Sequence, residues 1–150
     1  NATTNREAIE IAMNVDSRYL SEFDPNPPTD ESDLARVESE LNRKFPSDYE
    51  KFLREHDGGE GFIGSHYLIL WRASELTRFN REYEVETYAP GLLLIGSSGG
   101  GEAFAFDTRA GKFHIVMVPF IGMSLSSARR LSESFNGFLL KHKESTGYLF

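Results

Sequence analysis

The sequence predicts an α+β fold in a single domain spanning residues 1–150: a mainly antiparallel sheet flanked by N-terminal helices and one C-terminal helix. The hydrophobic period changes from 3.6 to 2.0 residues near Gly61 and returns to 3.6 near Ser126. The length of 150 residues fits one domain with a sizeable core.

The segment 92–118 predicts an antiparallel meander that organises the rest of the chain. Leu92–Ile95 is a continuous apolar run, as expected of a strand that is covered on both faces. The glycine-rich stretch Gly96–Gly101 can reverse the chain, and the residues of Glu102–Asp107 then alternate between larger and smaller side chains. A third apolar run, Phe113–Phe120, follows a second turn.

Three helices are expected before the sheet. The first covers residues 4–23, begins with a capping box and carries Phe23 on its apolar face. The second has apolar residues at spacings of three and four. The third begins at Pro46, because proline suits the first position of a helix, and Gly58 supplies its C-terminal stop.

The remaining elements follow from the same periodicities. Residues 61–71 are expected to form a strand pair or a bent strand, with Trp71 as a core anchor. A helix then ends in the acidic segment 81–86. After the meander, Ala128, Leu131 and Phe135 mark the apolar face of the final helix.

Composition limits the classes of function. The chain has no cysteine, which excludes a disulfide framework and a thiolate metal site and fits a cytoplasmic protein. No apolar run approaches the roughly 18 residues that would cross a membrane. The net charge of −7 argues against nucleic-acid binding and favours a basic partner, although the same charge also serves solubility alone.

The glycine cluster at residues 96–101 raises the question of catalysis. It lacks both a Gly-Lys-Ser/Thr sequence and a following helix, so it is neither a phosphate loop nor a dinucleotide fingerprint. Its Gly-x-Ser-x-Gly spelling leaves a small serine hydrolase as an alternative, with Ser98 as nucleophile and His114 or His142 as base. That motif requires a strand–turn–helix, whereas a strand follows here, so a hairpin turn is favoured.

The histidines give no metal signature. His56 and His66 flank a glycine-rich loop that contains Glu60, but no pair has the i, i+4 spacing that places two ligands on one helical face. We therefore expect surface or capping roles, and neither a metal nor a cofactor.

A series of short motifs runs through most of the chain. It starts with Leu41-(x)3-Phe45-Pro46-Ser47-Asp48-Tyr49-Glu50-Lys51-Phe52-Leu53 and Asp57-Gly58-Gly59, and continues through Leu70-Trp71, Glu75-Leu76, Ile95-Gly96, Gly101–Asp107 and Ser134–Leu139. Their order and spacing over residues 30–143 resemble the SUKH superfamily, with the helix at 4–23 as an addition. That superfamily takes in a fungal cell-wall-synthesis regulator and many bacterial immunity proteins. Phe45 stands where the family usually has leucine, and Asp57 where it has asparagine.

The resemblance implies a non-enzymatic domain that binds proteins, with no catalytic residue to carry over. The matched positions would be structural: Pro46 starts a helix, Gly58 stops it, Gly101 makes a turn, and two aromatic residues fill the core. These motif residues are Pro46, Gly58, Trp71, Gly101, Asp107 and Phe135.

The function expected from these observations is a cytoplasmic immunity-type protein that occludes a secreted bacterial toxin. Such toxins are often basic nucleases, and the chain is acidic. The alternatives are a regulatory scaffold linked to cell-wall synthesis and, from another class, the serine hydrolase. The residues expected to contact the partner are acids in a glycine-rich loop and at a helix end: Glu60, Glu82, Glu84 and Glu86.

Overall fold

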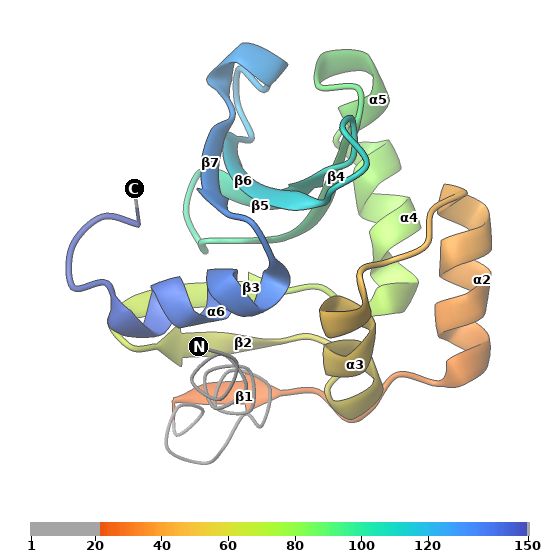
Figure 1. Ribbon diagram of the computed structural model, residues 1–150, viewed down its shortest axis with the longest axis horizontal. Helices are drawn as coiled ribbons and strands as arrows, with labels where there is room; N and C mark the ends of the chain where they lie inside the picture. The colour runs from red at the N-terminus through yellow and green to blue at the C-terminus, as the bar shows by residue number, and fades with distance from the viewer. Residues whose placement is uncertain (1–21, 150) are drawn as a thin grey trace.

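The computed structural model describes residues 22–149, and in this part of the chain seven strands form one sheet in chain order (Figure 1). Every neighbouring pair is antiparallel, which confirms the predicted α+β class. The strands are β1 (Phe23–Pro25), β2 (Gly59–Ile63), β3 (His66–Leu70), β4 (Leu92–Ser97), β5 (Glu102–Asp107), β6 (His114–Pro119) and β7 (Arg129–Ser132). The helices are α2 (Glu31–Leu41), α3 (Ser47–Glu55), α4 (Ala73–Glu82), α5 (Val85–Tyr88), the 3-10 turn η1 (Leu125–Ser127) and α6 (Phe135–Glu144).

The sheet bends around α6, which contacts both β2 and β6 although three strands separate them (Figure 1). Aromatic rings fill this concave side. Phe104 of β5 meets Phe138 of α6 edge-on at 4.9 Å, and Phe106 meets Tyr49 of α3 at 5.1 Å. The core of the domain therefore lies between the sheet, α3 and α6.

Helix α4 covers the other side of the sheet at the point where β3 and β4 separate. These strands pair only through Ile69–Ser97 and Leu70–Gly96. Beyond that point the Asn80 side chain replaces the missing strand: its Nδ2 donates to the Leu94 carbonyl at 2.9 Å, and its Oδ1 accepts from the Leu94 amide at 2.8 Å. With both faces covered, all six residues of β4 are buried. The apolar run predicted this for Leu92–Ile95, whereas Gly96 and Ser97 were expected in the turn and instead continue the strand.

The predicted meander is present as β4, β5 and β6. The β4–β5 turn covers Ser98–Gly101, and the residue that needs glycine there is Gly99, with φ of +83°. Gly101 has no positive φ, and a Cβ placed on it meets nothing within 4 Å. The predicted turn is present, but the residue that adopts the positive φ favoured by glycine is Gly99 and not Gly101.

The N-terminal helix prediction fails at its last residue. Phe23 pairs with Gly61 in β1 and is buried at 3% exposure, whereas the prediction placed it on a helix. An edge strand of three residues is too short to show the alternation of apolar and polar side chains by which a strand is predicted. The adjacent prolines indicated only a connector between two helices. Glu22, the residue before Phe23, lies in a bend, and residues 4–21 of the predicted helix lie outside the described part of the chain.

The C-terminal helix is shorter than predicted. Ala128 is extended, Leu131 belongs to β7, and α6 begins only at Phe135 with Ser134 as its N-cap. Residues 129–132 form an edge strand on β6, so tertiary pairing overrides their helical spacing.

Two motif positions act differently from the prediction. Pro46 is the N-cap of α3 and precedes its first residue. Helix α3 ends at Glu55, before Gly58. Gly58 instead has φ of +75°, and any Cβ there would collide with the carbonyl oxygens of Leu70 and Trp71. Its role is the close packing of the chain against the end of β3.

Candidate protein-binding surface

The strands β1, β2 and β3 bury one face and expose the other. Side chains alternate along β2, where Glu60 and Phe62 are exposed between buried neighbours. The register sets Asp24 beside Glu60 and Phe62 beside Tyr67. This outer face of β1–β3 therefore carries both acidic and aromatic side chains.

A pocket of about 360 Å³ lies where this outer face meets the start of α4. Its charged lining consists of three carboxylates, Asp24, Glu60 and Glu75, and one guanidinium, Arg72, so the lining carries a formal charge of −2 (one positive and three negative groups). Like charges gathered in a concave surface raise the local potential for an oppositely charged ligand. We call this site the acidic groove.

The carboxylates of the acidic groove are only partly neutralised. Glu60 accepts a hydrogen bond of 2.6 Å from the Tyr67 hydroxyl, which raises the pKa of Tyr67. Glu75 accepts from the Arg72 amide at 2.9 Å and caps α4. Among the described residues, no hydrogen bond or ion pair engages the Asp24 carboxylate. The groove therefore offers negative charge to a partner.

An aromatic wall borders the acidic groove. The Trp71 ring meets Phe79 edge-on at 4.8 Å and lies parallel to Tyr83 at 6.2 Å. Tyr83 is 43% exposed and also contacts Phe120, with ring centroids 4.7 Å apart. Acids beside an aromatic wall suit a basic side chain, because the alkyl stem packs on the rings while the charged end meets a carboxylate.

The structure does not bring the four predicted contact acids into one site. Glu60 lines the acidic groove, but from strand β2 and not from a loop. Glu82 lies 3.9 Å from Arg78 on α4, and Glu84 stands between α4 and α5 with φ of +54°. Glu86 lines a different pocket.

Sequence reasoning missed Asp24 and Glu75 as groove residues. Asp24 sits between Phe23 and a proline in a strand that was not predicted, and Glu75 looks like an ordinary helix N-terminal acid. Only the pairing of β1 with β2, next to the start of α4, brings them to Glu60.

Comparison with known proteins agrees with this architecture. Residues 28–141 match the model of the SMI1 / KNR4 family (SUKH-1). The chain belongs to this family. It is also 35% identical over 85 residues to the uncharacterized protein YnaB of Bacillus subtilis (strain 168); the match covers 57% of this chain and 54% of YnaB, so the chain matches only about half the length of that relative.

Two acids of the motif at residues 41–59, Asp48 and Asp57, hold the N-termini of other helices in place. One Asp48 oxygen accepts from the Asn136 amide at 3.0 Å, in the first turn of α6. Asp57 accepts from the Ala73 amide at 2.8 Å, at the start of α4. Both therefore satisfy helix N-terminal amides that have no partner within the helix.

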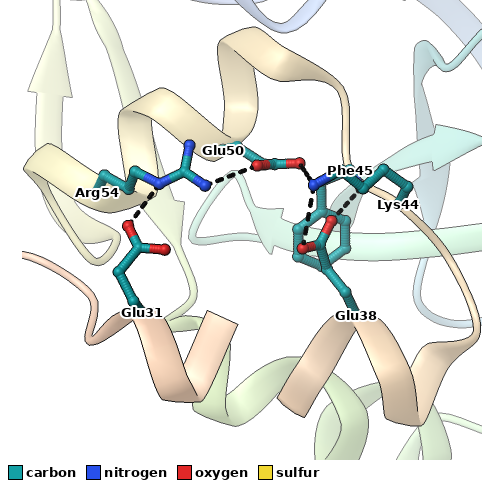
Figure 2. A network of polar contacts seen from close by, with 6 residues as sticks. All are labelled: Glu31, Glu38, Lys44, Phe45, Glu50 and Arg54. Carbon is teal, nitrogen blue, oxygen red and sulfur yellow. Dashed lines mark hydrogen bonds and ion pairs between the residues drawn. The ribbon is translucent and has the colours of Figure 1, made fainter. Parts of the chain in front are cut away.

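Glu50 is the most buried acid of this motif, at 5% exposure (Figure 2). It contacts Lys44 at 2.8 Å and Arg54 at 3.0 Å. Burial alone would raise the pKa of Glu50, but the hydrogen bond and charge of Lys44, aided by Arg54, outweigh it and lower that pKa. Arg54 also contacts Glu31 of α2 at 2.6 Å, while Glu38 accepts from the Phe45 amide at 2.7 Å. This network fastens α2 to α3.

The motif residues Trp71, Asp107 and Phe135 also make their contacts within the protein. Phe135 is fully buried, and Trp71 is 9% exposed. Asp107, the last residue of β5, binds Arg109 at the start of the β5–β6 turn, with the shorter ion-pair contact at 2.9 Å. The hydrogen bonds of that guanidinium lower the pKa of Asp107.

Ser98 lies in the SUKH-1 hairpin turn and not on a strand–turn–helix elbow. Its Oγ accepts from the Gly100 amide at 3.2 Å and donates to the Glu102 carbonyl at 3.4 Å. His142 Nδ1 instead contacts the Phe138 carbonyl at 3.0 Å inside the core. Within residues 22–149, no hydrogen bond joins Ser98 to a histidine.

The histidines near the glycine-rich loop are also separated. His56 is the C-cap of α3, whereas His66 Nε2 contacts the Ser145 carbonyl at 2.9 Å. Between residues 22 and 149 the structure contains no group of three or more potential ligands placed to hold a metal ion. Over the same part of the chain, no helix has the length and apolar character needed to cross a membrane.

Proposed function

We propose that this SUKH-1 protein is a cytoplasmic immunity-type protein that neutralises a secreted bacterial toxin by stoichiometric occlusion, with a basic nuclease as the fitting partner. Family membership supports the class, because the superfamily includes immunity proteins. The observation that carries the proposal is the acidic groove, where three carboxylates line a concave surface beside an aromatic wall that includes the exposed Tyr83.

The mechanism requires no chemistry from this chain. A nuclease binds phosphates through Lys and Arg side chains, so its cleft is positively charged. A net charge of −7 attracts such a cleft over a distance, and the acidic groove then receives one of its basic side chains. Occupying the cleft excludes nucleic acid in a one-to-one complex.

Co-expression tests this proposal. The genes beside the one that encodes this chain are searched for a large secreted protein with a C-terminal toxin domain, and that domain is expressed in bacteria with and without this chain. We expect the chain to restore growth and to form a one-to-one complex on size-exclusion chromatography with light scattering. A toxin that kills equally with the chain present, and forms no complex with it, would overturn the proposal.

A groove variant then locates the interface. Asp24→Asn, Glu60→Gln and Glu75→Gln together change the net charge from −7 to −4, because three acids become neutral. The matched control neutralises three exposed acids elsewhere, Glu40, Glu133 and Glu144, and reaches the same charge. We expect only the groove variant to lose protection. Equal protection by both would place the interface elsewhere while leaving toxin binding intact.

A further inference from the structure

A second pocket, of about 270 Å³, is lined by residues from the end of α2, from α4 and α5, and from the start of β4. Its lining differs in sign from the acidic groove. Two guanidinium groups, Arg43 and Arg81, line it with one carboxylate, Glu86, which gives a formal charge of +1 (two positive and one negative group). A cationic pocket is unexpected in a chain of net charge −7.

Neither arginine of this pocket is engaged by the described protein. Other arginines pair with acids: Arg36 lies 3.1 Å from Asp33, and Arg54 lies 2.6 Å from Glu31. Within residues 22–149, no ion pair or side-chain hydrogen bond holds Arg43 or Arg81. Their guanidinium groups are therefore available to a ligand.

The polar groups beside the arginines separate into used and unused donors. The Asn80 amide is fully occupied, because Nδ2 donates to the Leu76 and Leu94 carbonyls and Oδ1 accepts from the Leu94 amide. In contrast, the buried Thr77 Oγ1 has no hydrogen-bond partner among the described residues. Because that oxygen has almost no accessible surface, the groups in the pocket that an anionic ligand can reach are the two exposed guanidinium groups, and not the Thr77 hydroxyl.

We propose that this pocket binds a small phosphate monoester. Guanidinium groups match the oxygen geometry of a phosphoryl group, and its two negative charges balance two arginines. The apolar part of the lining, from Leu41, Val85 and Leu92, accommodates the organic part of the ester. The site is independent of the proposed toxin interface.

The test is a titration with two probes, inorganic phosphate and phenyl phosphate, at constant ionic strength in sodium chloride. Amide chemical shifts of the ¹⁵N-labelled protein report binding. We expect saturable shifts centred on Thr77, Arg81 and Gly91, with tighter binding of phenyl phosphate because its ring adds apolar contact. Shifts that are absent, do not saturate, or lie elsewhere would overturn the proposal.

Single substitutions test whether phosphate binding depends on the charged side chains of this pocket. Arg43→Gln and Arg81→Gln should each weaken binding about tenfold, as expected for losing a charged hydrogen-bond donor. Glu86→Gln should tighten binding, because it removes the negative charge that opposes the ligand. Arg36→Gln removes the same charge as the first two variants from a different site and should leave affinity unchanged. Equal weakening by Arg36→Gln would show general charge attraction only and contradict the proposal.

Vesicles distinguish a soluble ester from a lipid headgroup. Phosphatidylcholine vesicles with and without phosphatidic acid are sedimented with the protein. Binding to phosphatidic acid that is lost in Arg81→Gln assigns the site to a lipid source, whereas binding of phenyl phosphate alone assigns it to a soluble one. Binding of neither would refute the proposal.

Discussion

His142 is a neutral imidazole in the core, and its surroundings make stability depend on pH. Desolvation by burial lowers its pKa to about 4, against an ordinary value of 6.5. The Phe138 carbonyl opposes this shift and nearby His66 adds to it. The unfolded chain therefore binds an additional proton between pH 6.5 and 4, and stability falls as the pH drops through this window, by about 3 kcal/mol in total.

Urea unfolding at several pH values between 7.5 and 5 checks this prediction. The lowered pKa of His56, caused first by burial, adds a slope of the same sign, so the comparison with His142→Phe isolates the contribution of His142. We expect the variant to lose most of the slope. Glu50 and Asp107 act only at lower pH, because their ordinary values are 4.5 and 3.8. Parallel curves for both proteins would contradict the assignment.

Glu50 provides a second prediction at the residue scale. Removing its carboxylate in Glu50→Ala takes away the partner of Lys44 and Arg54 in a buried position, and should cost about 1.5–3 kcal/mol. The matched control is Glu40→Ala, because Glu40 forms only an exposed pair with Arg36 at 3.4 Å and should cost less than about 1 kcal/mol. Chemical unfolding at pH 7 measures both, and equal costs would show that burial of Glu50 adds nothing.

Replacing Trp71 or Phe135, two buried aromatic residues of the motif series, should lower the free energy of unfolding substantially. Phe135 is fully buried and contacts the rings of Tyr49 and Phe52, while Trp71 is 9% exposed and contacts Phe79. Replacing either with alanine should cost about 3–5 kcal/mol. Thermal melting measures the loss. Variants that melt within a degree or two of the parent would show that these rings carry little of the core energy.

At the scale of elements, Asn80 completes the sheet where β3 leaves β4. The variant Asn80→Ala leaves the Leu94 amide and carbonyl without partners and should cost about 1–3 kcal/mol for each group that stays dry. Hydrogen exchange gives a local measurement: the Leu94 amide should exchange much faster in the variant, with the Ala105 amide on the neighbouring strand as an internal reference. Unchanged protection of Leu94 would contradict the bridging role.

The sequence predicted the strands whose hydrophobic residues follow a clear pattern. It did not predict the short edge strands, which form only because they pair with a neighbouring strand. The hairpin over residues 61–71 and the meander over 92–118 alternate or run apolar, and both are present. The strand β1 has three residues and β7 has four, too few to establish a period. Leu131 and Phe135 have helical spacing, yet the pairing of Ile115 with Ser132 keeps the first of them in a strand.

The candidate site was less accessible to sequence reasoning than the fold. Glu60 could be selected because it stands in a glycine-rich stretch that was expected to form an exposed loop, and it does line the acidic groove, from a strand. Its groove neighbours Asp24 and Glu75 come from segments about 35 residues before and 15 residues after it. The β1–β2 register brings Asp24 to Glu60, and the position of the start of α4 beside these strands brings Glu75. Whether these acids contact a partner stays a prediction.

At the scale of the whole molecule, acidic side chains with different roles lie in different places. Motif acids such as Asp48 and Asp57 are used internally to hold helices, whereas Asp24 and Glu60 face outward on β1 and β2. The cationic pocket lies on the other side of α4, against β4. This separation leaves the outer face of β1–β3 as the negative surface that a basic partner would approach.

The most direct test of the central claim is the rate of association with the toxin domain, measured by stopped flow over a range of salt concentrations. Removing charges at an interface mainly slows association and weakens its salt dependence. We predict that Asp24→Asn/Glu60→Gln/Glu75→Gln associates about tenfold more slowly at low salt, while the control variant at Glu40, Glu133 and Glu144 keeps nearly the rate of the parent. Equal rates for the two variants, which share one net charge, would contradict the acidic groove as the binding site.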